Sequence, residues 1–224
     1  MHQTDDPAAA APVVAPGGPG DRLHAPATAR NRDAIRAVLT RVLPAEGTLL
    51  EVACGSGEHA AHLAPALPGW RWRPTEADPV SARGAATLLA DTGPDTVEPV
   101  RLFDVRTRPW PDPITRGVTA ILAINLIHIA PWAVAEALLA GAGHTLPPGG
   151  LLYLYGAFMV DGRHTAPSND AFDRSLRAQE SSWGVRDLTD VVAAARRHGL
   201  TLSETVSMPA NNLSVVFTRT DGSA

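Results

Sequence analysis

The sequence of 224 residues contains no lysine, a single cysteine and no apolar run near the ~20 residues that span a bilayer. All 19 basic residues are therefore arginine, and the formal net charge of −4 gives no reason to expect nucleic acid as a partner. One cysteine, Cys54, excludes an internal disulfide and favours a reducing compartment. No basic segment followed by an apolar one opens the chain, as a secretory signal requires. We therefore expect a cytoplasmic protein, monomeric or homodimeric, that acts without membrane or nucleic acid.

The length predicts one domain, preceded by a tail. Residues 1–25 are rich in alanine, proline and glycine without hydrophobic periodicity, so we expect an N-terminal tail that is disordered. Residues 26–220 are expected to form a single domain. Within it, residues 160–186 are too polar for a simple crossover between strands, and we interpret them as a cap over a substrate.

Apolar runs alternate with helical patterns along the domain, which predicts an α/β fold. Helices are expected over 29–43, 56–67, 79–91, 131–146 and 185–199, and strands over 48–54, 70–78, 97–105, 117–129, 151–159, 200–208 and 212–219. Continuous apolar strands separated by helices indicate a parallel sheet that is covered on both faces. The last two strands are joined by the short turn "PANN" and predict an antiparallel hairpin. The expected fold is a Rossmann-like, doubly wound, mostly parallel seven-stranded sheet ending in that hairpin.

The stretch "LLEVACGSGEHA", residues 49–60, suggests a cofactor site. Its spacing Gly55-x-Gly57-x-x-Ala60 fits the dinucleotide-binding fingerprint, but it also suits another adenosyl cofactor on the same kind of sheet. Glu76 lies about 20 residues further on, at the end of the next strand, where a carboxylate can accept the hydrogen bonds of a ribose diol. These features fit both NAD and S-adenosylmethionine (SAM).

Three features favour SAM. Glu51 ends the strand four residues before Gly55, where an acid would repel a pyrophosphate but suits the cationic amino group of a methionine moiety. A helix precedes the first strand, whereas dinucleotide-binding domains usually begin with the strand. The segment "LPPGGLLYLYG" is followed by a helix and a terminal hairpin, an order that is typical of the end of class I SAM-dependent methyltransferases. An NAD-dependent oxidoreductase remains the alternative.

Several segments resemble one family. Residues 51–57 resemble methyltransferase motif I, with Ala53 where the commonest pattern has its first glycine. With "ARNRDAI", "GSGEHAAHLA", "SNDAFDRSLRAQESSWGVRDL" and "MPANNLSVVF", the sequence resembles the DUF938 family, related to methyltransferase-like protein 26, over about residues 27–218. The resemblance implies a class I methyltransferase fold, SAM as cofactor and S-adenosylhomocysteine as product. It does not identify the acceptor. It also leaves open two alternatives: a SAM-dependent enzyme or SAM-binding accessory without methyl transfer, and a protein-interaction module.

Motif position then implies which residues contact the cofactor. They are Glu51, Ala53, Gly55 and Gly57 around the methionine half, Glu76 at the ribose, Asp104 and Val105 at the adenine, and Asn125 near the sulfonium. Asp78 is a second candidate for the ribose. Asp104 and Asn125 could instead serve as a cap and a strand-end turn residue. His59 and His62 lie three residues apart, but no third ligand accompanies them, so no metal is expected.

The acceptor site is expected where the cap faces the cofactor. His128 could act as general base or as a structural histidine, because methyl transfer needs mainly in-line positioning. The candidate substrate-binding residues are Asn31, Arg32, Trp132, Asn169, Phe172, Asp173, Trp183 and Arg186. Arginines there would suit a small-molecule acceptor with a carboxylate or phosphate. Alternatively, polar pairs within the cap stabilise the cap itself, and Trp132 belongs to the core.

Overall fold

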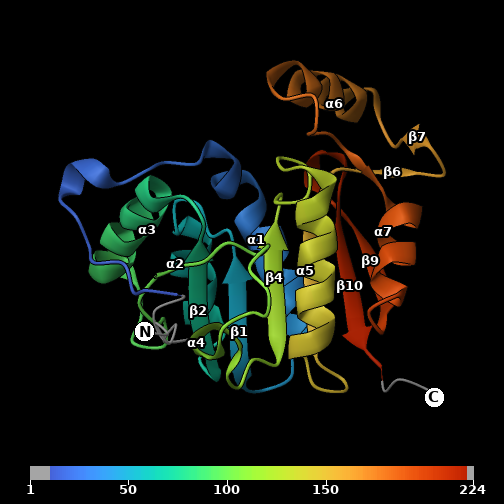
Figure 1. The fold of residues 1–224 in the computed structure, drawn as a ribbon. Coiled ribbons are helices and arrows are strands. Elements are labelled where there is room, and N and C mark those ends of the chain that lie inside the picture. Colours follow the sequence, from blue (N-terminus) through green and yellow to red (C-terminus); the bar gives the residue numbers. More distant parts are fainter. Residues whose placement is uncertain (1–10, 221–224) are drawn as a thin grey trace, which may run out of the picture.

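A seven-stranded sheet lies at the centre of residues 11–220, which are the residues described by the computed structural model (Figure 1). The strand order is β3-β2-β1-β4-β5-β10-β9, and β10 runs antiparallel to both of its neighbours. The strands are β1 (Gly47–Val52), β2 (Trp70–Glu76), β3 (Arg101–Leu102), β4 (Ala120–Ile124), β5 (Leu151–Gly156), β9 (Leu200–Met208) and β10 (Asn212–Arg219). The predicted Rossmann-like fold with a terminal antiparallel hairpin is confirmed.

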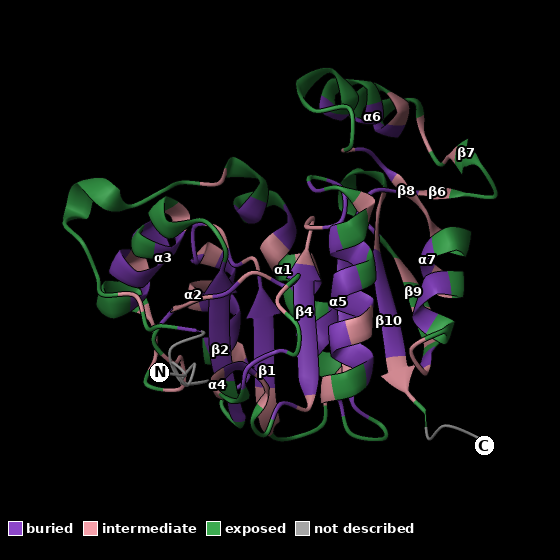
Figure 2. Cartoon of the chain, in the orientation of Figure 1, coloured by how far each residue is buried: buried purple, intermediate pink, exposed green. Residues whose placement is uncertain are grey.

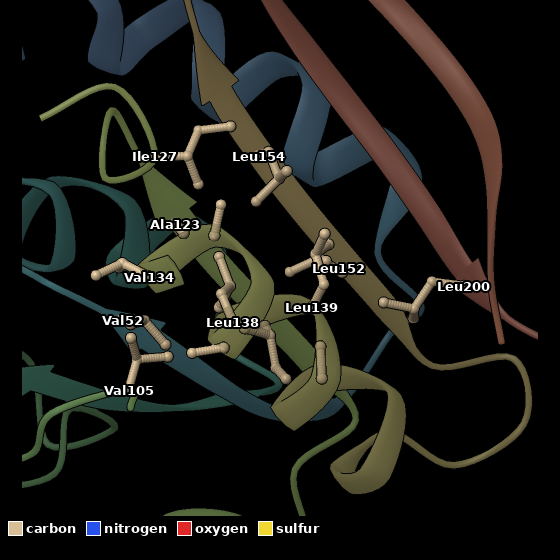
Figure 3. Close-up of a cluster of buried hydrophobic side chains, with 14 of the residues drawn as sticks. Val52, Val105, Ala123, Ile127, Val134, Leu138, Leu139, Leu152, Leu154 and Leu200 are labelled. Carbon is tan, nitrogen blue, oxygen red and sulfur yellow. The ribbon is translucent and has the colours of Figure 1, made fainter. Parts of the chain in front are cut away.

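Helices cover both faces of this sheet because the parallel strands are apolar on both sides (Figure 2). On one face lie α1 (Pro26–Val42), α2 (Glu58–Leu63) and α3 (Pro79–Thr92). On the other lie α5 (Trp132–Thr145), α7 (Leu188–Arg196) and the short α4 (Asp112–Thr115). Leu138 and Leu139 of α5 pack against Leu152 and Leu154 of β5 in the second of these layers (Figure 3).

The segment after β5 rises above the carboxyl end of the sheet (Figure 1). It contains β6 (Phe158–Val160), β7 (Arg163–His164), α6 (Pro167–Gln179) and β8 (Arg186–Asp187), and the three strands form a small sheet of their own. Most of α6 is exposed (Figure 2). The last helix, α7, begins at Leu188, next to the predicted opening near Asp187, because the Asp187 carboxylate accepts the Thr189 N–H as its N-cap.

Residues 11–25 differ from the expected disordered tail. Val13 forms an antiparallel bridge with Arg101, and Val14 donates its N–H to the Val100 carbonyl. Gly17 donates to the Thr87 hydroxyl of α3. The segment therefore covers the edge of β3, whose unpaired backbone groups need partners. Residues 1–10 lie outside the described residues.

The predicted strand over 97–105 is reduced to β3, two residues long. Pro99 has no N–H to donate to the sheet, so regular pairing begins only after it. Phe103 still donates to the Glu76 carbonyl, which keeps the loop after β3 beside the end of β2. Within residues 11–220, no helix combines the length and apolar character that a membrane span needs.

Candidate functional site

The turn after β1 has three residues in the left-handed region: Ala53 at φ 57°, Gly55 at φ 57° and Gly57 at φ 77°. A Cβ on Gly57 would lie 3.2 Å from Ala85 of α3, so this glycine allows the turn and α3 to pack closely. A Cβ on Gly55 would meet no atom within 4 Å, so Gly55 borders open space. The turn therefore presents bare backbone to that space, as a closely bound ligand requires.

Glu51 is a buried carboxylate without a cationic partner. Its side chain is 2% exposed and accepts a hydrogen bond from Trp72 Nε1 at 2.7 Å. Among residues 11–220, no arginine or histidine forms an ion pair with it. Burial raises the pKa of Glu51 to about 8; the Trp72 hydrogen bond opposes that shift, and the nearby Glu76 carboxylate adds to it. A cation bound beside Glu51 would offset this cost.

Glu76 ends β2 beside this turn and is already partly satisfied. Its Oε2 accepts the Gly55 N–H at 2.9 Å, and its Oε1 accepts the N–H groups of Ala77 and Asp78 at 2.8 and 3.1 Å. A carboxylate offers about four acceptor positions, so one remains free. Glu76 can therefore bind one hydroxyl without rearrangement, and a second by releasing a backbone N–H. Asp78 instead caps α3 through Ser81.

A cavity of about 290 Å³ opens beside these strand ends, and we name it the strand-end cavity. Its lining residues are Val52, Ala53, Ala77, Phe103, Asp104, Val105, Arg106, Leu126, Ile129, Ala130, Pro131, Val134 and Trp183. Its walls are mainly apolar, with Asp104 and Arg106 as the charged pair. The structure thus brings Ala53, Asp104 and Val105 together, as predicted, and adds Trp183 from the end of the cap.

Asp104 forms an ion pair with Arg106 at 2.7 Å, and this pair holds the pKa of Asp104 below its usual value. The Arg106 N–H also donates to Asp104 Oδ1 at 2.9 Å, which is a turn-capping contact. An adenine amino group could bind the same carboxylate only by sharing it with Arg106. Asp104 therefore has the capping role that the sequence left open as an alternative, and its contact with an adenine stays a prediction.

Asn125 and His128 converge on Gly156 at the ends of β4 and β5. Asn125 has φ 59° and donates its N–H to the Tyr155 carbonyl. A Cβ on Gly156 would lie 2.1 Å from His128 Nε2 and 3.2 Å from Asn125 Oδ1, so glycine makes room for both side chains. The two side chains are thus packed over one glycine beneath the cap.

The His128 ring is completely buried and stacks edge-on against Phe158, with 5.2 Å between ring centroids. Neither ring nitrogen has a hydrogen-bond partner among the described residues. Burial lowers the pKa of His128 to about 3, and the nearby Arg186 contributes to that shift. In this conformation the imidazole is neutral, weakly basic and inaccessible, so its role as a general base stays a prediction from the sequence.

Three of the predicted substrate residues hold the cap in place. Asp173 accepts the Val185 N–H at 2.7 Å and Arg177 Nε at 2.9 Å; burial alone would raise the pKa of Asp173, but these bonds lower it. Asn169 donates to the Asn211 carbonyl, which ties α6 to the hairpin turn. Arg186 donates to the carbonyls of residues 127, 130 and 182.

Arg186 also stacks over Trp132, with its guanidinium carbon 6.0 Å from the ring centroid. Both residues line a separate hollow of about 460 Å³ between α5, α7 and the cap, and not the strand-end cavity. The polar pairs within the cap, which the sequence left open as an alternative, are therefore present.

Asn31, Arg32 and Phe172 differ in their surroundings. Asn31 Oδ1 lies 2.9 Å from His59 Nε2, and both residues are buried. Arg32 Nε is buried without a hydrogen-bond partner within residues 11–220. Phe172 is 39% exposed on α6, one of the large apolar side chains left at the surface. Among the predicted substrate residues, Arg32 thus has an Nε–H without an acceptor within residues 11–220, and Phe172 has a ring that is partly exposed.

The remaining candidates have structural surroundings. His62 pairs with Asp33 at 2.9 Å rather than with His59. Cys54 is buried, and burial together with the nearby glutamates raises the pKa of its thiol, which disfavours a nucleophilic role. Trp72 is a site residue that the sequence analysis missed, although the alternation "WRWR" already placed Trp70 and Trp72 on one face of β2.

A comparison with protein-family models shows to which family the chain belongs. Residues 22–219 match the family model described as "Protein of unknown function (DUF938)". The chain belongs to the DUF938 family. The match spans nearly all of the described residues, from just before α1 to the end of β10.

Solved structures with the same fold include several SAM-dependent methyltransferases. The chain is similar to the S-adenosylmethionine-dependent methyltransferase SibL, with TM-score 0.69 and 21% identity over 87% of this chain and 56% of SibL. It is also similar to an O-methyltransferase family 2 protein from Planctomyces limnophilus in complex with apigenin, with TM-score 0.68 and 20% identity over 84% of this chain and 60% of the other.

A third neighbour is human N-acetylserotonin methyltransferase in complex with SAM, with TM-score 0.68 and 13% identity over 85% of this chain and 55% of the human protein. The DUF938 chain therefore spans a little more than half the length of these neighbours. At these identities the similarity shows a class I methyltransferase-like fold.

Proposed function

We propose that this DUF938 protein is a SAM-dependent methyltransferase that acts on a small-molecule acceptor. The observation that carries the proposal is the buried Glu51 carboxyl group, which accepts a hydrogen bond from Trp72 and has no cationic partner among residues 11–220. It ends β1 beside the bare backbone of Gly55, at the carboxyl edge of a parallel sheet, where α/β proteins bind their ligands. A cationic amino acid moiety fits this position, whereas a pyrophosphate does not.

Each part of the cofactor has chemically suitable residues nearby. Glu51 would hold the amino group of the methionine half, and Glu76 would accept a ribose hydroxyl. The apolar strand-end cavity would take the adenine between Val105 and Trp183, with Asp104 toward its amino group. Asn125, over Gly156, would face the methyl-bearing sulfur. When bound, SAM supplies an electrophilic methyl group on a sulfonium.

The acceptor is expected under the cap, beside Asn125. The neighbours include an O-methyltransferase family 2 protein in complex with apigenin, which favours a small-molecule acceptor. Asn169, Asp173, Trp132 and Arg186 would shape this side of the site by fixing the cap. Asn31, Arg32 and Phe172 are left to contact the acceptor, and Arg32 favours one with an anionic or strongly polar group.

Isothermal titration calorimetry with SAM, S-adenosylhomocysteine and NAD tests the proposal. We expect binding of both adenosyl sulfur ligands and none of NAD. Glu76→Gln should weaken S-adenosylhomocysteine binding about tenfold or more, because the amide accepts fewer hydrogen bonds and loses the charge. Glu46→Gln, at an exposed glutamate before β1, is the matched control and should bind like the wild type. Tight NAD binding without a SAM signal would overturn the proposal in favour of an oxidoreductase.

A further inference from the structure

A second cavity, of about 610 Å³, lies along the later half of α5, and we name it the α5 cavity. Ala140 and His144 line it, whereas Val134, near the start of the same helix, lines the strand-end cavity. At a rise of ~1.5 Å per residue, Val134 and His144 lie roughly 15 Å apart along the helix axis. The α5 cavity is therefore distinct from the proposed cofactor site.

Small residues and one large ring form the apolar part of the α5 cavity. A Cβ on Gly141 would lie 2.0 Å from the Trp110 ring, so glycine at this position lets the indole pack directly on the helix. Trp110 Nε1 donates to the Val105 carbonyl at 2.9 Å, and its ring meets Phe103 edge-on with 5.4 Å between centroids. The indole is thus fixed, and with Pro109 and Ala140 it forms an apolar wall.

The polar part of the α5 cavity is basic. Arg108, His144 and His198 line it, and no acidic side chain among residues 11–220 does. Arg108 donates one guanidinium N–H to the Ala137 carbonyl at 2.6 Å. Five N–H groups are available on a guanidinium, so donors remain for a ligand.

The positive charge near this cavity is that of two arginines, Arg108 and Arg197, beside His198. Burial lowers the pKa of His198, the neighbouring Arg197, Arg108 and His144 lower it further, and Glu136 opposes these effects. An anion placed among these groups would relieve their mutual repulsion. Apolar walls with a few convergent polar groups are also the usual composition of a small-molecule site.

We propose that the α5 cavity is a second ligand site, which binds a small organic anion with an apolar ring and a carboxylate. The ring would lie against Trp110 and the carboxylate would accept hydrogen bonds from Arg108, with the two histidines as further donors. This site goes beyond the proposed methyltransferase function and does not depend on it.

Calorimetric titration with 1-naphthoate tests the site, with the neutral 1-naphthamide as the matched ligand. We expect the naphthoate to bind and the amide to bind about tenfold more weakly or not at all, since hydrogen bonds to charged groups are the stronger ones. Arg108→Gln should weaken naphthoate binding about tenfold or more. Arg106→Gln is the matched protein control, because Arg106 lines the strand-end cavity instead.

Ala140→Leu provides a second variant that keeps every charge and fills the α5 cavity, and it should also weaken naphthoate binding about tenfold or more. Circular dichroism confirms that each variant is folded. Loss of binding in Arg108→Gln and Ala140→Leu, but not in Arg106→Gln, supports the proposal. The proposal would be overturned if naphthoate still bound to both variants, or if its binding were lost in Arg106→Gln instead. It would also be overturned if the amide bound as tightly as the naphthoate.

Discussion

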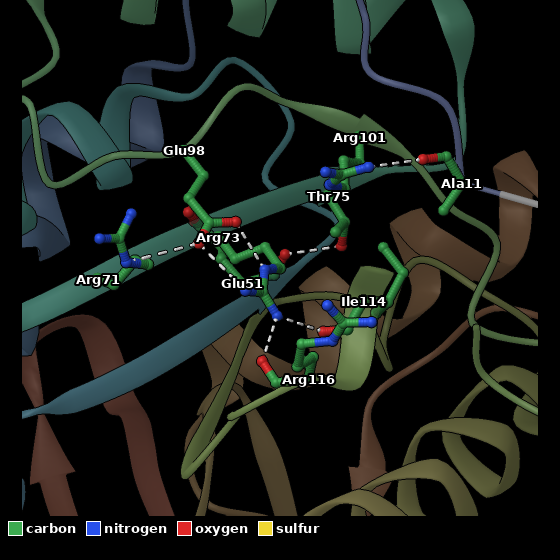
Figure 4. Close-up of polar contacts among 9 residues, drawn as sticks. All are labelled: Ala11, Glu51, Arg71, Arg73, Thr75, Glu98, Arg101, Ile114 and Arg116. Atoms are coloured by element: carbon green, nitrogen blue, oxygen red, sulfur yellow. Dashed lines mark hydrogen bonds and ion pairs between the residues drawn. The ribbon is translucent and has the colours of Figure 1, made fainter. Parts of the chain in front are cut away.

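Two carboxylates beside β2, the half-buried Glu98 and the buried Glu51, differ in how the protein compensates their charge. Glu98 receives two hydrogen bonds from the Arg73 guanidinium, at 2.7 and 3.1 Å, and Arg73 also donates to two backbone carbonyls (Figure 4). Glu51 receives one indole N–H, from Trp72, and no cation within the described residues. The first charge is fully used by the fold. The second has no countercharge among residues 11–220, which is why we propose that it faces a cationic ligand.

The difference follows from alternation along one strand. Trp72 and Arg73 are consecutive in β2, so their side chains point to opposite faces of the sheet. Trp72 packs on the face of α1, α2 and α3 and reaches Glu51, while Arg73 reaches the carbonyl of Ile114 in α4. A carboxylate buried without a countercharge costs stability, and proteins concentrate such groups at functional sites. Two consecutive residues of β2 thus contact two different carboxylates, Glu98 with a countercharge and Glu51, the proposed ligand contact, without one.

Removing the compensated pair should have the largest effect on stability. Arg73→Met leaves the Glu98 carboxylate and two carbonyls without their donor, so we expect unfolding to become easier by roughly 3–5 kcal/mol. Urea denaturation followed by circular dichroism measures this. The double change Arg73→Met with Glu98→Gln should recover part of the loss. Arg116→Gln, which breaks the exposed pair with Asp112, should change stability by less than ~1 kcal/mol.

Removing the uncompensated charge should act on binding instead. Glu51→Gln should weaken SAM binding roughly 10- to 100-fold, because a hydrogen bond between ionised groups is lost. The same change should leave stability at neutral pH equal or higher, since glutamine is neutral in the buried site without taking up a proton. Calorimetry and urea denaturation of one preparation measure both quantities. A variant that unfolds readily but binds SAM normally would reverse the roles assigned to the two carboxylates.

The pH dependence of stability should also distinguish the two sites. Burial raises the pKa of Glu51 from its ordinary value of 4.5 to about 8. Between these two pH values the folded protein keeps a proton on Glu51 that the unfolded chain releases. The contribution of Glu51 to stability therefore falls by ~1.4 kcal/mol per pH unit between those two values. Urea midpoints at pH 5, 6 and 7 measure it, and Glu51→Gln should fall less steeply than the wild type. Equal slopes would contradict the raised pKa.

The smallest expected effect concerns the turn after Glu51. Ala53 has φ 57°, a conformation that costs an L-residue ~1–2 kcal/mol. Ala53→Gly removes this strain but increases the freedom of the unfolded chain, so a net gain of less than ~1 kcal/mol is expected. Ala61→Gly, inside α2, is the control and should lose ~1 kcal/mol. A loss in both variants would show that Ala53 is unstrained.

The sheet could be predicted from the sequence because apolar runs and glycine or proline breaks recur along residues 47–219. The turn at Gly55 and the acids at the ends of β1 and β2 follow from the same pattern. The prediction worked where local periodicity determines structure. It also placed Asp104 beside Val105, since both end one apolar segment.

Contacts between distant segments could not be predicted in this way. The pairing of Val13 with Arg101 depends on an exposed strand edge, which composition does not reveal. The complete burial of His128 depends on Phe158, which its ring meets edge-on, and on Gly184, which donates its N–H to the His128 carbonyl. Trp183 was expected at the acceptor, but it lines the cavity with Val105, because the cap returns to the sheet there.

The most direct test of the role of Glu51 is SAM titration by calorimetry at pH 6.0 and 7.5, in the wild type and in Glu51→Gln. Both pH values lie below the pKa of Glu51, which is about 8. They also lie below the ordinary α-amino range of ~7.7–8.0, so the amino group of the ligand stays mostly cationic. The wild type should bind SAM roughly tenfold or more tightly at pH 7.5, because Glu51 ionises more readily there, and Glu51→Gln should bind weakly and equally at both values. Identical, pH-independent affinities in the two proteins would contradict the account.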